Sequence, residues 1–153
     1  MEHWLKNIYA THCLGIELAQ PLLTDLTVAN DIPPTVFLSG NLGAGKTCLV
    51  QGLARGLNIF ESVTSPTFTL SQWYTGRINN NIIQLKHIDL YRLENSKMAD
   101  EFFAEENYEV IGSNTIIVVE WPERLSIIPK YCWSVQLYIE EKGRRVSIKA
   151  PKQ

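Results

Sequence analysis

The spacing of hydrophobic residues along the chain predicts three helices. Leu14, Leu18 and Leu22 recur at every fourth position, which puts them on one face of a first helix. Thr11 is a good N-cap for this helix, and Ser96 can cap a third, acidic helix. The predicted helices cover 11–23, a stretch of about twelve residues that ends near Gly56, and 97–107.

Shorter hydrophobic runs, several of them alternating with polar residues, predict strands. They cover 35–39, 68–74, 82–89, 115–119, 133–139 and 144–150. Turn residues at 76–81 and at Lys142-Gly143 join two pairs of these strands into hairpins. The run 115–119 is apolar on both faces, so we expect it in the middle of the sheet, beside 35–39. The order of elements predicts an α/β fold, a mixed β-sheet with a parallel centre flanked by helices.

Length and composition indicate one ordinary globular domain over residues 1–153, with 45% hydrophobic and 20% charged residues. No run approaches the roughly 18 apolar residues of a membrane span, and the start of the chain lacks the apolar core of a signal peptide. Cys13, Cys48 and Cys132 are far apart and contain no C-x-x-C pair, which favours reduced thiols. We therefore expect a cytoplasmic protein that does not act at a membrane.

Charge is distributed unevenly along the chain. The net charge of −2 gives no global attraction to nucleic acid. The segment 94–109 carries six acidic residues and Lys97 as its one basic residue, whereas the tail from Lys142 onward is basic without acids. A solvated helix face and a protected edge strand would explain both features. The alternative is an acidic docking face and a basic patch near phosphate.

Residues 40–47 read G-N-L-G-A-G-K-T and fit the phosphate-loop pattern G-x-x-x-x-G-K-[ST] at every specified position. The glycines let backbone N–H groups approach phosphate oxygens, and the following helix points its positive end at the same anion. Lys46, expected to face solvent, adds a charge for the β- and γ-phosphates, and the Thr47 hydroxyl can bind Mg²⁺. The sequence thus predicts a P-loop NTPase-like fold that binds nucleotide and Mg²⁺. The predicted phosphate-binding residues are Gly40, Asn41, Leu42, Gly43, Ala44, Gly45, Lys46 and Thr47.

Two strand ends offer the carboxylate that such a site needs beside the metal. Glu120 follows the apolar run 115–119, and by burial it is the better metal partner. Asp89 ends a strand interrupted by polar residues, among them His87, and is expected to be half-exposed. We therefore predict that Asp89 positions or activates the attacking water, or holds a metal-bound water. His87 is either a support for these acids or a structural histidine.

Three further motifs follow the loop: S-P-T-F-T-L at 65–70, H-I-D-L-Y-R-L at 87–93 and V-E-W-P-E-R-L at 119–125. Together with the loop they closely resemble the TsaE family, also called YjeE. The resemblance implies a cytoplasmic ATPase, weakly active alone, that works with the TsaB–TsaD complex and reaches tRNA indirectly through it. That machinery attaches a threonylcarbamoyl group to the adenosine beside the anticodon, in tRNAs reading codons that begin with A. It also implies a mixed sheet of about seven strands.

The same resemblance implies roles for individual residues. Phosphates would bind at 43–47, and Thr47 with Glu120 would hold Mg²⁺. Asp89 matches the family's other essential acid, so Asp89, Lys46 and Thr67 form the expected catalytic set. The segment 65–69 resembles a nucleotide-sensing loop from which Thr67 could reach the γ-phosphate or its metal. The segment before and at Thr11 would flank the adenine.

Three other functional classes compete with an ATPase. A GTPase needs D-x-x-G and N-K-x-D, and neither motif occurs in the chain. A small-molecule kinase would need an acceptor domain, for which 153 residues leave little room. The third class is a non-catalytic, nucleotide-gated binding module, in which ATP occupancy alone controls the docking of a partner. For two residues the sequence leaves two interpretations each. Trp121 is either a core aromatic or a surface anchor for a partner. Arg92 either contacts phosphate or pairs with acids of the helix in 94–109.

Overall fold

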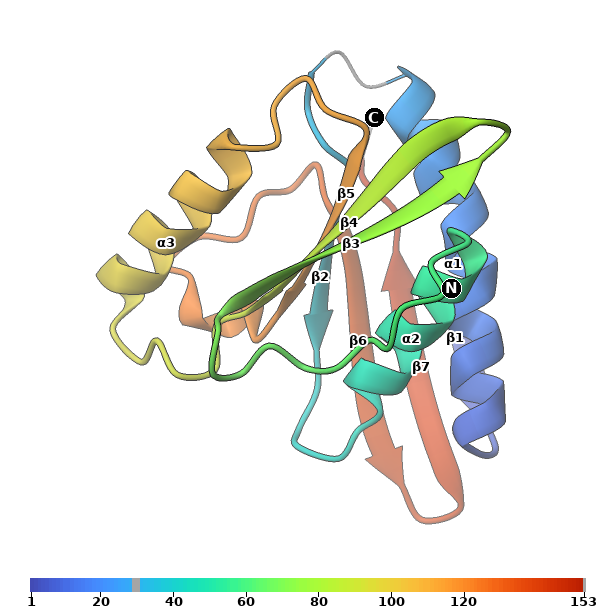
Figure 1. The fold of residues 1–153 in the computed structure, drawn as a ribbon. Helices are drawn as coiled ribbons and strands as arrows, with labels where there is room; N and C mark the ends of the chain where they lie inside the picture. The colour runs from blue at the N-terminus through green and yellow to red at the C-terminus, as the bar shows by residue number, and fades with distance from the viewer. Residues whose placement is uncertain (29–30, 153) are drawn as a thin grey trace.

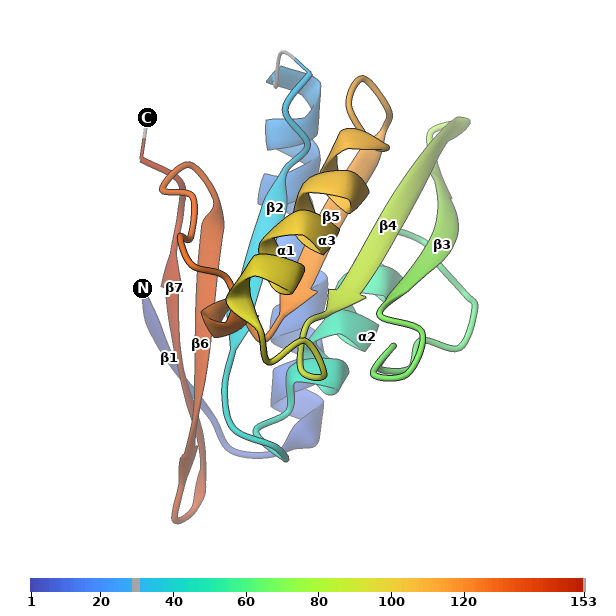
Figure 2. The same cartoon turned by 90° about the vertical axis from the view of Figure 1, so that its left-hand side faces the viewer.

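The computed structural model describes residues 1–28 and 31–152. Within that part of the chain, a seven-stranded sheet lies between helices on both of its faces (Figures 1 and 2). The helices are α1 (Ile8–Val28), α2 (Lys46–Gly56) and α3 (Ser96–Tyr108), with a short 3-10 helix η1 (Pro122–Arg124). The strands are β1 (Glu2–Leu5), β2 (Thr35–Ser39), β3 (Ser71–Ile78), β4 (Asn81–Asp89), β5 (Thr115–Glu120), β6 (Trp133–Glu140) and β7 (Gly143–Lys149).

The strand order is β1-β7-β6-β2-β5-β4-β3. The four central strands β6, β2, β5 and β4 are parallel, and the outer pairings are antiparallel. The predicted mixed sheet with a parallel centre is confirmed, and so is the place of β5 beside β2. Because parallel strands end at the same edge, the residues after β2, β4 and β5 meet there.

The first strand and the helix starts differ from the prediction. β1 pairs with β7 and was not predicted, because four residues at the chain start carry too little pattern. The first helix begins at Ile8, and the side chain of Asn7, not Thr11, accepts the N–H of Ala10 in its first turn. Likewise Asn95, not Ser96, caps α3 by accepting two backbone N–H groups.

Both predicted hairpins form, but the first turn is shorter than the predicted 76–81 and the second is shifted by one residue. The first hairpin turns at Asn79 and Asn80, which both have positive φ, so β3 runs on to Ile78 instead of ending at residue 74. The predicted start of that strand, 68–70, belongs to the turn before it. In the second hairpin Glu140 pairs with Gly143, so the turn is one residue earlier than Lys142-Gly143.

The two faces of the sheet form separate hydrophobic clusters. One cluster packs α1 and α2 against the sheet, and the other packs α3 (Figure 2). The helices α1 and α2 cross at two glycines: a Cβ on Gly15 would lie 2.2 Å from the Leu49 carbonyl oxygen, and one on Gly52 2.0 Å from that of His12. The two helices therefore pack closely, backbone against backbone. No helix in the described residues is long and apolar enough to cross a bilayer.

The acidic segment is only partly a solvated face. The buried Lys86 ammonium lies 2.8 Å from carboxylate oxygens of both Glu106 in α3 and Glu109 just after it, so these acids anchor the end of the helix to β4. In the basic tail, Arg145 pairs with Glu2 and Glu140 on neighbouring strands. The buried Lys86 is satisfied by these acids, and Arg145 has partners within the sheet, which favours the interpretation without a docking face.

Candidate functional site

The phosphate-loop segment 40–47 connects β2 to α2 at the carboxyl edge of the parallel strands (Figure 1). Gly40, Gly43 and Gly45 have φ values of 151°, 80° and 104°, a region that side chains with a Cβ rarely adopt. Gly45 directly precedes α2, so the free N–H groups of its first turn face the concave side of the loop. The loop therefore offers the cradle of N–H groups that phosphate oxygens fit.

Lys46 does not face solvent as the sequence suggested; only 6% of it is exposed. Its ammonium donates hydrogen bonds to the carbonyl oxygens of Gly40 and Asn41 and lies 4.6 Å from the centroid of the Trp121 ring. Burial lowers the pKa of this ammonium below its ordinary value. In the opposite direction, three nearby carboxylates, the first that of Glu120, raise the same pKa.

A cleft of about 370 Å³ opens beside the loop and brings together most of the predicted site residues. Its lining includes Leu42, Gly43, Gly45, Lys46, Thr47, Ser65, Thr67, Asp89, Tyr91, Glu120 and Trp121. These residues come from four separate segments of the sequence. The structure thus places the loop, both acids and the hydroxyl-rich segment around one cavity.

Thr11, by contrast, lies outside this cleft. It is buried in the first turns of α1, where its hydroxyl donates to the Asn7 carbonyl. It lines a neighbouring cavity of about 300 Å³ together with Lys6, Ala44 and Arg144. The two cavities share Gly43 and Gly45 as lining residues, so they meet at the loop.

Asp89 accepts three hydrogen bonds that occupy both of its carboxylate oxygens. The hydroxyls of Ser65 and Thr67 donate to Oδ2 at 2.8 and 2.9 Å, and the backbone N–H of Tyr91 donates to Oδ1 at 2.9 Å. The expectation of a half-exposed residue is wrong, since Asp89 is only 2% exposed. The segment before β3 is consequently tied to the strand end that carries this acid.

Glu120 has a different environment, although it is buried to a similar degree (3% exposed). Its Oε1 lies 2.8 Å from Nε2 of His87, a fully buried residue of β4. Among the described residues, no hydrogen bond is donated to its second oxygen, Oε2. This oxygen belongs to a residue that lines the cleft, and it is the one left for a ligand.

An aromatic pair in the lining of the cleft was not predicted as a unit. The rings of Tyr91 and Trp121 lie 4.9 Å apart, and the guanidinium of Arg124 lies within 6 Å of both, at 5.6 and 5.9 Å. Trp121 is half-buried, it packs against the hydrophobic cluster on the α3 face of the sheet, and its backbone has a positive φ of 58°. The motif V-E-W-P-E-R-L at 119–125 is the sequence feature that pointed to Trp121 and Arg124.

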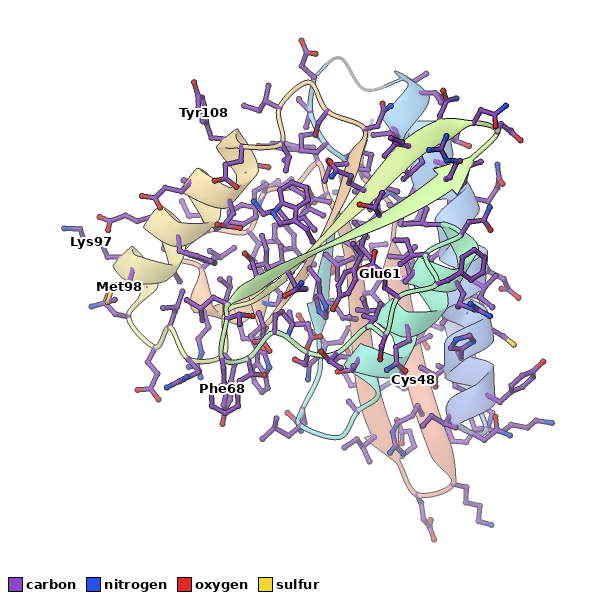
Figure 3. The ribbon with its side chains drawn as sticks, in the orientation of Figure 1. Cys48, Glu61, Phe68, Lys97, Met98 and Tyr108 are labelled. Carbon is purple, nitrogen blue, oxygen red and sulfur yellow. The ribbon has the colours of Figure 1, made fainter. Side chains whose placement is uncertain are left out.

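Arg92 and Phe68 form another contact beside the site. Phe68 is 83% exposed and points away from the sheet (Figure 3), and the Arg92 guanidinium lies 5.1 Å from its ring centroid. Arg92 thus pairs with an aromatic ring and not with the acidic helix. A third contact, from Arg144 to the Gly43 carbonyl at 3.2 Å, had no signal in the sequence because the two residues are 101 positions apart.

The donors around the cleft fit a Mg²⁺ ion that is held jointly with nucleotide phosphates. Thr47 and Glu120 line the same cavity, and Glu120 keeps an unshared oxygen. In the described part of the chain, no group of three or more His, Cys, Asp or Glu could hold a metal. Mg²⁺ is commonly bound by one or two carboxylates plus substrate phosphates, and this donor set matches that requirement.

The fold and the loop define a P-loop α/β protein. A family model described as threonylcarbamoyl adenosine biosynthesis protein TsaE matches residues 5–146. The chain belongs to the TsaE family, as the four sequence motifs predicted.

Individual relatives support the same family assignment. A tRNA threonylcarbamoyladenosine biosynthesis protein TsaE from Nostoc sp. is 44% identical over 146 residues, which is 93% of this chain and 80% of that protein. The protein of the same name from Treponema pallidum is 42% identical over 111 residues, 72% of this chain and 76% of that protein. The crystal structure of Bacillus subtilis YdiB matches with a TM-score of 0.64 over 99% of this chain and 86% of that one. At 23% identity this last match supports the fold.

Proposed function

We propose that the chain is a Mg²⁺-dependent ATPase required for N6-threonylcarbamoyladenosine modification of tRNA. It acts in the cytoplasm with the TsaB–TsaD complex, on the adenosine beside the anticodon in tRNAs reading codons that begin with A. Family membership and two relatives named for this biosynthesis support the pathway. One observation carries the ATPase assignment: the phosphate loop, Asp89 and Glu120 line a single cleft.

Each residue of the loop has a role that follows from its position. Backbone N–H groups at 43–47 bind the phosphate oxygens, and Lys46 exchanges its carbonyl partners for the β- and γ-phosphates. Thr47 and Glu120 hold Mg²⁺, which neutralises phosphate charge when it is bound. Because Lys46 is already desolvated in the cleft, its charge interacts strongly with an incoming anion.

Asp89 acts on the attacking water. Its carboxylate is held by the Ser65 hydroxyl on Oδ2 and by the Tyr91 N–H on Oδ1, and these two contacts keep its orientation toward a water when Thr67 moves to the phosphate. When nucleotide enters, Thr67 is close enough to the cleft to exchange Asp89 for the γ-phosphate. This exchange would connect nucleotide state to the segment 65–69.

The adenine is assigned to the cavity beside Thr11. That cavity adjoins the loop at Gly43 and Gly45, where the nucleoside of a phosphate-bound ATP would continue. Its lining combines Lys6, Ile8 and Arg144, which supply polar groups and an apolar surface for a base.

The test is ATP turnover with and without TsaB–TsaD, together with tRNA modification in a reconstituted system. We expect slow release of inorganic phosphate alone, faster release with the partners, and no modified adenosine when the chain is omitted. Transfer of phosphate to an acceptor would support a small-molecule kinase instead. Modification that needs ATP binding but proceeds without its hydrolysis would support a nucleotide-gated binding module.

A further inference from the structure

His87 lies inside the sheet, directly behind the carboxyl edge that carries the two acids. It is on the same face of β4 as Asp89, and it is flanked by Gln72 of β3 and Val118 of β5. None of its surface is exposed, so it touches neither solvent nor a ligand in the cleft. A buried polar ring in a sheet centre requires a partner, and its partner is Glu120.

The hydrogen bond to Glu120 determines which ring nitrogen carries the proton. A carboxylate oxygen is an acceptor, so Nε2 of the ring is the donor to Oε1 across the 2.8 Å contact. The other nitrogen, Nδ1, is buried without a hydrogen-bond partner in the described part of the structure. A bare acceptor is tolerated there better than an unpaired N–H. The contact to Oε1 therefore uses an N–H at Nε2 of the ring.

We propose that His87 is a positioning residue for Glu120: it fixes one carboxylate oxygen so that the other is presented to Mg²⁺. The proposal rests on the proposed function, in which Glu120 binds the metal. Without this bond the glutamate side chain could rotate among several conformers, since it has three torsions and no other donor from the described residues. Partners that orient a metal-binding side chain typically contribute about 10–100-fold in metal affinity.

Two substitutions separate positioning from simple packing. His87→Phe keeps a ring of similar size but removes the donor, whereas His87→Gln keeps an amide N–H that can reach the same oxygen. Lys86→Met is the matched control, because Lys86 is equally buried on the same strand but pairs with Glu106 and Glu109 on the opposite face. The Lys86→Met variant should have lower thermal stability, but residue 86 does not contact Glu120.

The measurement is the binding of a fluorescent ADP analogue to each purified protein over a range of Mg²⁺ concentrations, and in EDTA. For His87→Phe we expect the Mg²⁺ concentration at half-maximal tightening to rise by about tenfold or more, with unchanged affinity in EDTA. His87→Gln should recover most of this loss, and Lys86→Met should match the wild type. A wild-type Mg²⁺ response in His87→Phe, or an equal loss in Lys86→Met, would overturn the inference.

A ligand-free measurement keeps this outcome separate from the proposed function. In nitrogen-15 spectra of the nucleotide-free wild type, we expect the proton of His87 on Nε2 and its signal to change in Glu120→Gln. A ring that carries no proton on Nε2 overturns the inference even if the protein is an ATPase. If the spectra agree but the wild type shows no Mg²⁺ response, the metal role of Glu120 fails, and the positioning role fails with it.

Discussion

Asp89 and Glu120 are paired in register at the ends of the parallel strands β4 and β5, yet their carboxylates have different partners. Both oxygens of Asp89 accept hydrogen bonds from the chain, whereas Glu120 shares one oxygen with His87 and keeps the other. Burial does not distinguish the two acids, contrary to the expectation from sequence. The proposed division of roles rests instead on this difference in hydrogen bonding, which leaves Oε2 of Glu120 without a donor among the described residues.

Glu120→Gln should weaken Mg²⁺-dependent nucleotide binding by about tenfold or more, because the amide keeps the shape but loses the charge that faces the metal. The amide oxygen can still accept from His87, so the fold should be retained. Nucleotide affinity measured at several Mg²⁺ concentrations, and in EDTA, checks the prediction. An unchanged Mg²⁺ dependence would transfer the metal role to Asp89.

Lys46→Met should abolish ATP binding or turnover. The change removes the ammonium that lies among loop carbonyls and keeps the apolar stem, so it creates little cavity in a buried position. Lys46→Ala should have the same effect on ATP with a larger loss of stability. ATP binding, phosphate release and thermal unfolding on the same samples separate these effects. Wild-type hydrolysis in either variant contradicts the phosphate-loop interpretation.

The loop and the sheet centre could be predicted because their signals are local. The phosphate-loop pattern specifies backbone conformation residue by residue, and the apolar run 115–119 requires burial on both faces. The same reasoning from neighbouring residue types predicted that β4 is half-exposed, because Lys86 and His87 are polar. Their partners Glu109 and Glu120 are 23 and 33 residues away, so the pairing that permits their burial does not appear in any short window.

The errors at element ends have a related origin. Asn7 and Asn95 start their helices in place of the residues chosen from the sequence, because several polar residues near each start could serve as caps. The β3–β4 turn depends on two asparagines with positive φ inside a longer polar stretch. The identity of these elements was predictable, whereas their limits depended on backbone geometry.

Gly52→Ala should destabilise the fold, although alanine ordinarily favours a helix interior by about 1 kcal/mol over glycine. At this position the added Cβ would meet the His12 carbonyl oxygen at 2.0 Å, so α1 and α2 must separate. Forced repacking of this kind costs about 1–3 kcal/mol, which exceeds the helix gain. Chemical denaturation measures the difference directly. A gain in stability would show that the two helices do not cross as closely as described.

Free tRNA should bind the isolated chain weakly and without sequence preference. The net charge is −2, and the basic tail is partly engaged: Arg145 pairs with two acids, and Arg144 donates to the loop. Few phosphate contacts are therefore available, and affinity depends strongly on their number. Filter binding or fluorescence anisotropy at physiological salt checks this. Sub-micromolar affinity without partners would contradict it.

Asp89→Asn should lower ATP turnover by at least about tenfold, and it should abolish tRNA modification in the reconstituted system. Nucleotide affinity should stay near normal, since the loop, Lys46 and Mg²⁺ still bind the phosphates. The amide loses the basicity needed to act on water.

The asparagine also supplies one acceptor oxygen where the carboxylate supplied two, so part of the tether to Ser65, Thr67 and Tyr91 is lost. A Ser65→Ala variant removes one hydroxyl contact while it keeps the acid and Thr67, and it therefore serves as the control. If that variant loses as much turnover as Asp89→Asn, the acid acts by holding the segment and not on the water. Binding and hydrolysis are measured on one preparation of each protein. If affinity falls together with turnover in Asp89→Asn alone, Asp89 is itself a primary metal or nucleotide ligand, and the difference in hydrogen bonding between the two acids does not set their roles.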